Sequence, residues 1–179
     1  MVLGKTTSPI FITGTEQSGL LPLIVPPPTL CRVVPGFTWS QRAFRDWLKY
    51  SASRNAGGTL LAPKLGRDTA SHIYVTDEAS LDGILSPTSI TNRLGLSNPA
   101  QTECMRYGCV IIRFTISDPT VAIFPPLHMY AAQQGLTVNG AREWLIPNIR
   151  LDRLMDVMYV GVSPYRGRPF WYDISLTDQ

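Results

Sequence analysis

The stretch Gly140-Ala-Arg-Glu-Trp-Leu-Ile-Pro-Asn148 places one carboxylate, Glu143, at the start of a short apolar run. Gly140 is suited to a turn, residues 144–146 form the apolar run, and Pro147 has no N–H to donate to a strand ladder. We therefore predict a short buried strand that starts at Glu143 and ends near Pro147. Burying a carboxylate there is unfavourable unless it has a partner or a task. Glu143 is either a strand-end residue in a surface ion pair or a functional group, and the rest of the chain has to decide between these.

The length of 179 residues fits one domain that can bury a full core. Charged residues make up 16% and the formal net charge is +3, which by itself does not indicate nucleic-acid binding. The three cysteines, Cys31, Cys104 and Cys109, form an odd set without C-x-x-C spacing, so we predict reduced thiols buried in the core. Only two histidines, His72 and His128, are present and no Cys/His cluster exists, so we expect no metal site.

Residues 1–28 are interrupted by Gly and Pro and end in three consecutive prolines, which favour an extended polyproline II segment. We predict a leader or linker over residues 1–28 and a single domain over residues 29–179. No apolar run reaches membrane-spanning length, and no secretory signal pattern follows Lys5, so we expect neither a membrane anchor nor a cleaved signal peptide. The sequence is also consistent with a fragment cut from a longer chain.

Hydrophobic patterning predicts more strands than helices. Short β-branched or apolar runs predict strands at residues 30–34, 72–76, 109–116, 121–124, 157–162 and 169–172, besides the strand at Glu143. Capping residues and helical spacing predict helices from Thr38 to about residue 55, after Asp77, from Ser86-Pro87 to Gly95, over about 127–134 and near 151–154. Residues 59–70 and 97–107 are expected to be loops. The predicted fold class is α+β with mixed or antiparallel sheets and short flanking helices.

Three features of different types occur in order on separate predicted strands. Arg32 lies inside the first strand, Thr76 ends the second, and Glu143 begins the strand that ends in Ile-Pro. This order resembles the mono-ADP-ribosyltransferase toxins of the Arg–Ser/Thr–Glu class, which include cholera-type and pierisin-type enzymes and toxin domains used between bacteria. The resemblance covers roughly residues 29–162. Its most specific part is residues 140–149, GAREWLIPNI, which is close to the family's Gln/Glu-x-Glu stretch with its following apolar residues and prolines.

The resemblance implies an ADP-ribosyltransferase-like split β-sandwich and a role for each of these residues with NAD as the substrate. Arg32 would bind a phosphate and the adjacent ribose, because a guanidinium offers planar, bidentate recognition. Glu143 would hold a ribose hydroxyl and stabilise the oxocarbenium-like transition state, and Thr76 would hydrogen-bond Glu143 and fix its rotamer. Aromatic side chains would flank the cationic nicotinamide ring. The candidates for this role are Trp39, Phe44, Tyr74 and Trp144, although helical spacing assigns Phe44 to the core.

Two departures from the family pattern bear on the acceptor. Arginine-modifying members carry a second acid two residues before the catalytic Glu, and here that position is Ala141. Its absence argues against an arginine acceptor and leaves another amino acid, a nucleic acid or water open. The hydroxyl motif is also reduced, since only Thr76 matches and Asp77 follows it. The loop over residues 133–139 would contact the acceptor in this family.

The resemblance further implies a bacterial toxin or effector, secreted or delivered into a target cell without a cleaved signal peptide and acting in its cytoplasm. A producing cell would then need an immunity or antitoxin protein. The acceptor, the delivery route and the oligomeric state stay open.

Three other readings of the chain remain. Residues 30–35 also resemble the opening of RES-domain toxins, which degrade NAD and whose glutamate would have to be near Glu78 or Asp82. His72 and Tyr74 resemble the NAD-binding strand of His–Tyr families with a similar fold. A reading of a different class is a non-enzymatic structural or interaction domain, which predicts no NAD binding at all.

Overall fold

The computed structural model describes residues 29–36, 57–58, 61–67, 69–84, 86–131, 133–165 and 170–172. The predicted leader over residues 1–28 and the predicted helix from Thr38 to about residue 55, with Trp39 and Phe44, lie outside these residues. In the described part, no helix is both long and apolar enough to cross a membrane.

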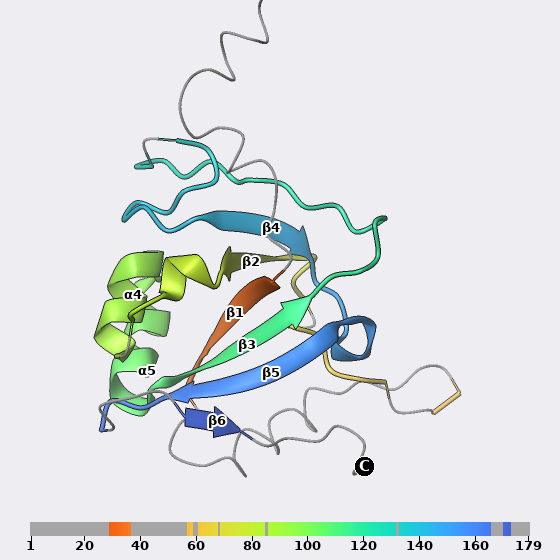
Figure 1. The fold of residues 1–179 in the computed structure, drawn as a ribbon, viewed down its shortest axis with the longest axis horizontal. Helices are drawn as coiled ribbons and strands as arrows, with labels where there is room; N and C mark the ends of the chain where they lie inside the picture. Colours follow the sequence, from red (N-terminus) through yellow and green to blue (C-terminus); the bar gives the residue numbers. More distant parts are fainter. Residues whose placement is uncertain are drawn as a thin grey trace, which may run out of the picture.

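The fold is α+β, built on a six-stranded sheet in the order β4-β2-β1-β3-β5-β6 (Figure 1). Every neighbouring pair of strands is antiparallel. The strands are β1 (Thr29–Pro35), β2 (His72–Asp77), β3 (Cys109–Thr115), β4 (Glu143–Pro147), β5 (Met155–Val162) and β6 (Phe170–Tyr172). The described helical elements are η1 (Ala79–Leu81), α4 (Pro87–Leu94), α5 (Asn98–Tyr107) and η2 (Leu151–Arg153).

The sheet divides between β1 and β2 into two groups of strands. β1 pairs with β3 along its whole length, from Thr29 to Pro35, but with β2 only at Leu30 and Cys31. β2 pairs with β4 from His72 to Thr76. Figure 1 accordingly shows β4 and β2 inclined differently from β1, β3 and β5. Beyond Cys31, therefore, β1 separates from β2 and leaves space between the two groups.

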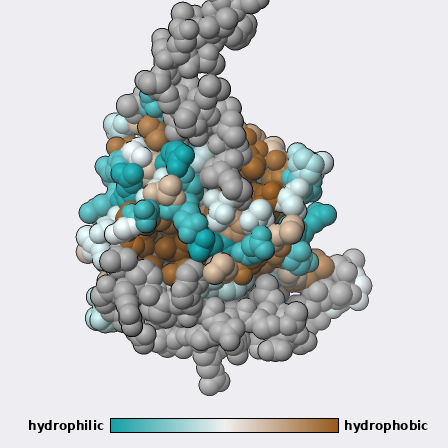
Figure 2. Space-filling view, viewed as in Figure 1, coloured by the Kyte–Doolittle hydropathy of each residue, from teal (hydrophilic) through white to brown (hydrophobic). Residues whose placement is uncertain are grey.

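Two hydrophobic clusters follow from the alternation of side chains along the strands. The first joins the two groups of strands and includes Trp144 and Ile146 of β4 with Phe114 of β3. The second lies under α4 and α5 and includes Ile90 and Cys104. Figure 2 shows that one face of the molecule also exposes apolar areas on either side of a hydrophilic band. Because Trp144 belongs to the first cluster, Glu143, its neighbour in the same strand, points to the opposite face of β4.

The strand predictions are confirmed for β1 to β5 within one or two residues at each end, and β6 lies within the predicted 169–172. The helix α4 begins after Ser86, whose side chain accepts a hydrogen bond from the Ser89 N–H, and ends at Gly95 with φ +61°. The turn at Gly140 is also confirmed, since this residue has φ +79° and donates its N–H to the Thr137 carbonyl. Pro147 stays within β4, which is an edge strand and therefore tolerates the missing donor.

Three predicted elements are wrong. Residues 98–107 form the helix α5 rather than a loop; its one buried residue is Cys104, so its sequence carries almost no apolar period. The described residues of 127–134 form no helix, and Leu127, Met129 and Tyr130 are exposed instead of packed. Residues 121–124 form no strand, since only Phe124 makes a bridge, to Leu145.

Candidate active site

One row of side chains crosses the sheet at the point where its two groups of strands meet. Thr76 of β2 is the register partner of both Cys31 in β1 and Glu143 in β4. Residues directly opposite each other across a strand pair present their side chains on the same face. The strands that carry Cys31, Thr76 and Glu143 are far apart in the sequence, and the fold makes them neighbours.

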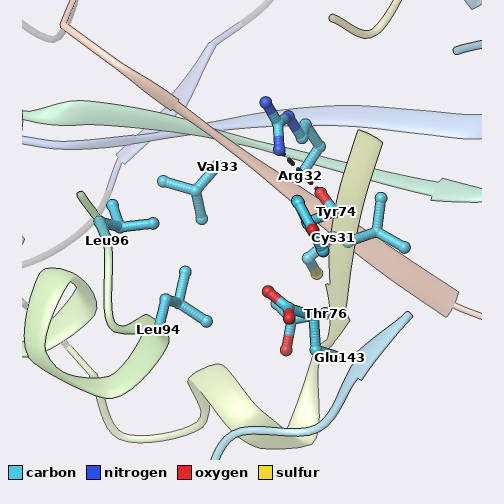
Figure 3. A pocket seen from close by; sticks show the side chains of 9 residues that line it. Cys31, Arg32, Val33, Tyr74, Thr76, Leu94, Leu96 and Glu143 are labelled. Atoms are coloured by element: carbon cyan, nitrogen blue, oxygen red, sulfur yellow. Dashed lines mark hydrogen bonds between the residues drawn. The ribbon is translucent and has the colours of Figure 1, made fainter. Parts of the chain in front are cut away.

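A cleft lies along this row, between β1 and β2 (Figure 3). It encloses about 300 Å³, including space open to solvent. Four of the residues predicted for NAD binding or catalysis line it: Arg32, Tyr74, Thr76 and Glu143. The remaining lining residues are mostly apolar and come from β1, β2 and the end of α4: Cys31, Val33, Val75, Leu94 and Leu96.

Glu143 is largely buried, with a relative exposure of 9%. Its Oε2 is in contact with Nε2 of His128, and its backbone N–H donates to the Gly135 carbonyl at 2.8 Å. Burial raises the pKa of the Glu143 carboxyl, while the His128 hydrogen bond and the charges of His128 and Arg32 oppose that rise. The carboxylate therefore lies in a weakly hydrated setting, where an interaction with a developing positive charge is stronger than in water.

Arg32 lines the same cleft but does not contact Glu143. Its Nη1 donates to the Tyr74 carbonyl at 2.8 Å, and Figure 3 shows the guanidinium on the other side of β1 from the carboxylate. The Arg32 Nε is buried and has no hydrogen-bond partner among the described residues. Burial lowers the pKa of Arg32, and the charge of Glu143 opposes this effect. The two groups thus act on each other electrostatically from two sides of the cleft, and one donor of Arg32 is unused.

The expected contact between Thr76 and Glu143 is not present. The Thr76 hydroxyl donates instead to the Arg142 carbonyl at 2.6 Å. Arg142 in turn forms an ion pair with the buried Asp77, which accepts a hydrogen bond from the Ser80 N–H at 2.8 Å. Thr76 therefore holds the backbone that leads into β4, and the rotamer of Glu143 is fixed by another residue.

The aromatic residues predicted to flank nicotinamide separate into three cases. Tyr74 lines the cleft and is 47% exposed. Trp144 is fully buried in the first hydrophobic cluster, so the expectation that it contacts a ligand is wrong. Trp39 lies outside the described residues.

His128 is the site residue that the sequence did not reveal. It lies in the segment 116–142 and packs its ring on Tyr74, with centroids 5.6 Å apart. Between Asp118 and Arg142 this segment contains no charged residue, and His128 is its one histidine. A solitary histidine fifteen positions before Glu143 was the available signal, but nothing in the sequence indicates how the segment folds back.

Other chemistries find less support around this cleft. Burial raises the pKa of the Cys31 thiol to about 12, so Cys31 is protonated at neutral pH and is a poor nucleophile. His72 is exposed at the far end of β2, and Glu78 pairs with Arg113 at 2.7 Å; neither lines the cleft. Within the described residues, no group of three or more His, Cys, Asp or Glu side chains is arranged to hold a metal ion.

Comparisons with protein-family models, with curated proteins and with solved structures found no match to this chain.

Proposed function

We propose that this chain is an NAD-dependent mono-ADP-ribosyltransferase of the Arg–Ser/Thr–Glu class. The observation that carries the proposal is the adjacency of β1, β2 and β4. The sequence provides an ordered arginine, hydroxyl and glutamate on three separate strands, and these strands are neighbours around one cleft. A non-enzymatic domain gives no reason for these three side-chain types to line one cleft.

The division of the sheet supports the finer fold assignment within this proposal. An ADP-ribosyltransferase-like split β-sandwich needs two groups of strands with a ligand cleft where they part. Here β1 and β2 pair only at Leu30 and Cys31, and the cleft begins beside that pair.

Glu143 is the proposed catalytic residue. In the reaction, the bond between the nicotinamide nitrogen and the ribose carbon breaks with its electron pair leaving on nicotinamide. The acceptor then forms a bond to the same carbon and releases its proton. A carboxylate beside the ribose stabilises the positive charge that develops between these events and holds a ribose hydroxyl. The low exposure of Glu143 strengthens that interaction.

Arg32 is the proposed dinucleotide-binding residue. Arg32 lines the cleft and is partly exposed, so its guanidinium offers planar N–H donors to a phosphate or ribose oxygen there. Because it lies across β1 from Glu143, it would bind the part of NAD remote from nicotinamide. Tyr74 would contact the nicotinamide ring, and Thr76 would support the Glu143 strand through the Arg142 carbonyl.

The proposed acceptor is either water or a group on a macromolecule that is not an arginine side chain. Ala141 occupies the position of the second acid and is fully buried, so it provides no base for a guanidinium acceptor. Release of ADP-ribose to water would make the protein an NAD glycohydrolase, which is the second candidate function. Either activity suits a toxin or effector that is delivered into the cytoplasm of a target cell. An immunity protein would neutralise it in the producing cell.

Calorimetric titration with NAD together with an assay of nicotinamide release tests the proposal. Wild type should bind NAD and release nicotinamide, and Glu143→Gln should bind NAD while losing at least about 100-fold in kcat, the order expected for removal of one preorganised electrostatic group. Glu103→Gln, a matched change at an exposed position of α5, should behave as wild type. A wild type that neither binds nor consumes NAD overturns the proposal, and full turnover by Glu143→Gln overturns the catalytic assignment.

A further inference from the structure

The segment 116–142 is attached to the sheet edge at several points around His128. Phe124 and Leu145 of β4 exchange two backbone hydrogen bonds, of 3.2 and 2.8 Å. The Gly135 N–H donates to the Pro126 carbonyl at 2.6 Å, and the Gly135 carbonyl accepts from the Glu143 N–H. Pro126 and Gly135, the two ends of this loop, are therefore fixed to each other and to the strand that carries Glu143.

Further attachments hold the second part of the segment against α4. The Thr137 hydroxyl donates to the Arg93 carbonyl at 2.9 Å, and the Asn139 side chain donates to the Asn92 carbonyl. Arg93 returns a hydrogen bond to the Asn139 carbonyl at 3.2 Å. A loop held at this many points can present one side chain at a defined position.

We propose that His128 is a positioning residue for Glu143, fixing its carboxylate through Oε2 and leaving Oε1 for the ribose hydroxyl of the substrate. The direct contact between His128 Nε2 and Glu143 Oε2 carries this inference. It takes over the role that sequence reasoning gave to Thr76, whose hydroxyl is engaged by the Arg142 carbonyl. The identity of the substrate rests on the proposed function, whereas the coupling of the two side chains does not.

His128 also sets the charge of Glu143. The titratable groups around the carboxylate are Cys31 from β1, Tyr74 from β2, His128 from the loop and, on the other side of β1, Arg32, while α4 contributes apolar Leu94. The neighbouring Arg142 is paired with Asp77. Of these groups His128 is the one in direct contact, and its effect on the carboxyl pKa exceeds that of Arg32. Without His128, burial would act on Glu143 with less opposition, and the carboxyl would hold its proton to a higher pH.

Three variants with two measurements test this inference. The first measurement is the pH titration of the Glu143 side-chain carboxyl by ¹³C NMR, assigned with Glu143→Gln; it needs no substrate. His128→Phe should titrate at a higher pH than wild type. His128→Gln keeps an N–H donor without the charge and should fall between the two. Met129→Ala, an 86% exposed neighbour in the same loop, should titrate as wild type.

The second measurement is nicotinamide release over the same pH range. His128→Phe should lower kcat by about 100-fold, the order expected when a reacting group loses its orientation, with the affinity for NAD unchanged. The acid limb of its pH–rate profile should move upward together with the NMR titration. A His128→Phe titration identical to that of wild type, or a wild-type kcat, overturns the inference. If no variant and no wild type releases nicotinamide, the proposed function fails, and the NMR titration still decides whether His128 sets the state of Glu143.

Discussion

Thr76 and Glu143 are register partners across β2 and β4, yet the Thr76 hydroxyl donates to the carbonyl of Arg142 and not to the carboxylate beside it. Thr76 is 3% exposed, so this hydrogen bond is shielded from water. The hydroxyl therefore acts on the backbone that leads into β4.

Thr76→Val should lower the free energy of unfolding by about 1–2 kcal/mol, because a sheltered carbonyl loses its donor while the side-chain shape is kept. Thr76→Ser retains the hydroxyl and should lose less than Thr76→Val in urea denaturation. If the two variants are equally destabilised, the methyl group rather than the hydroxyl is what matters at this position.

Trp144→Phe should destabilise the protein without changing its affinity for NAD, because Trp144 is buried in the core on the face of β4 opposite Glu143. Truncation to alanine should cost about 3–5 kcal/mol. Tyr74→Ala provides the contrast, since Tyr74 is half exposed at the cleft and its loss should weaken NAD binding with little effect on unfolding. Thermal unfolding and calorimetry on the three variants separate the two roles.

The stability of the wild type relative to Glu143→Gln should fall as the pH rises towards neutral. Burial raises the folded-state pKa of this carboxyl above the ordinary value of a glutamate. The stability associated with such a group is fully present below the unfolded-state pKa, about 4.3 for Glu, and is lost as the pH rises through the folded-state pKa. Urea denaturation should therefore show the stability of the wild type relative to Glu143→Gln falling from pH 4 to pH 7. A difference that is the same at both pH values would contradict this account.

The cysteines should resist thiol reagents in the native state. All three are free and buried, and burial raises the pKa of Cys31 to about 12. A thiol–disulfide reagent at pH 8 requires an accessible thiolate, so labelling should be absent in buffer and should reach Cys31, Cys104 and Cys109 in denaturant. Mass spectrometry of labelled peptides checks this directly, and rapid native labelling of Cys31 would show that the cleft gives access to its sulfur.

The sequence predicted most strands because their cores are short apolar runs bounded by Gly, Pro or Asp, as at residues 109–116 and 157–162. It predicted α4 from local chemistry, the Ser86-Pro87 start and the Gly95 stop. The helix α5 was missed because one buried residue, Cys104, leaves no period to detect.

The candidate site was partly predictable from strand alternation and from the types and order of its residues. Strand alternation determines which face each side chain occupies, so the burial of Trp144 opposite Glu143 could have been deduced from their adjacency. Residue type and order singled out Arg32, Thr76 and Glu143, but not their hydrogen-bond partners. The contact of His128 with Glu143 depends on how residues 116–142 fold back along the edge of β4, which is set by long-range backbone bonds such as that between Phe124 and Leu145.

The hydrogen bond from Arg32 to the Tyr74 carbonyl gives this arginine a structural role between β1 and β2. β1 and β2 pair only at Leu30 and Cys31, so this bond links the two strands beyond the last pair of their ladder and bridges the gap there. Replacing Arg32 with a small residue would remove both this hydrogen bond and the positive charge. A loss of activity in that variant could then come from either change. Arg32→Lys keeps the charge and can still reach the carbonyl with one donor. It therefore separates the loss of bidentate recognition by the guanidinium from the loss of the hydrogen bond between β1 and β2.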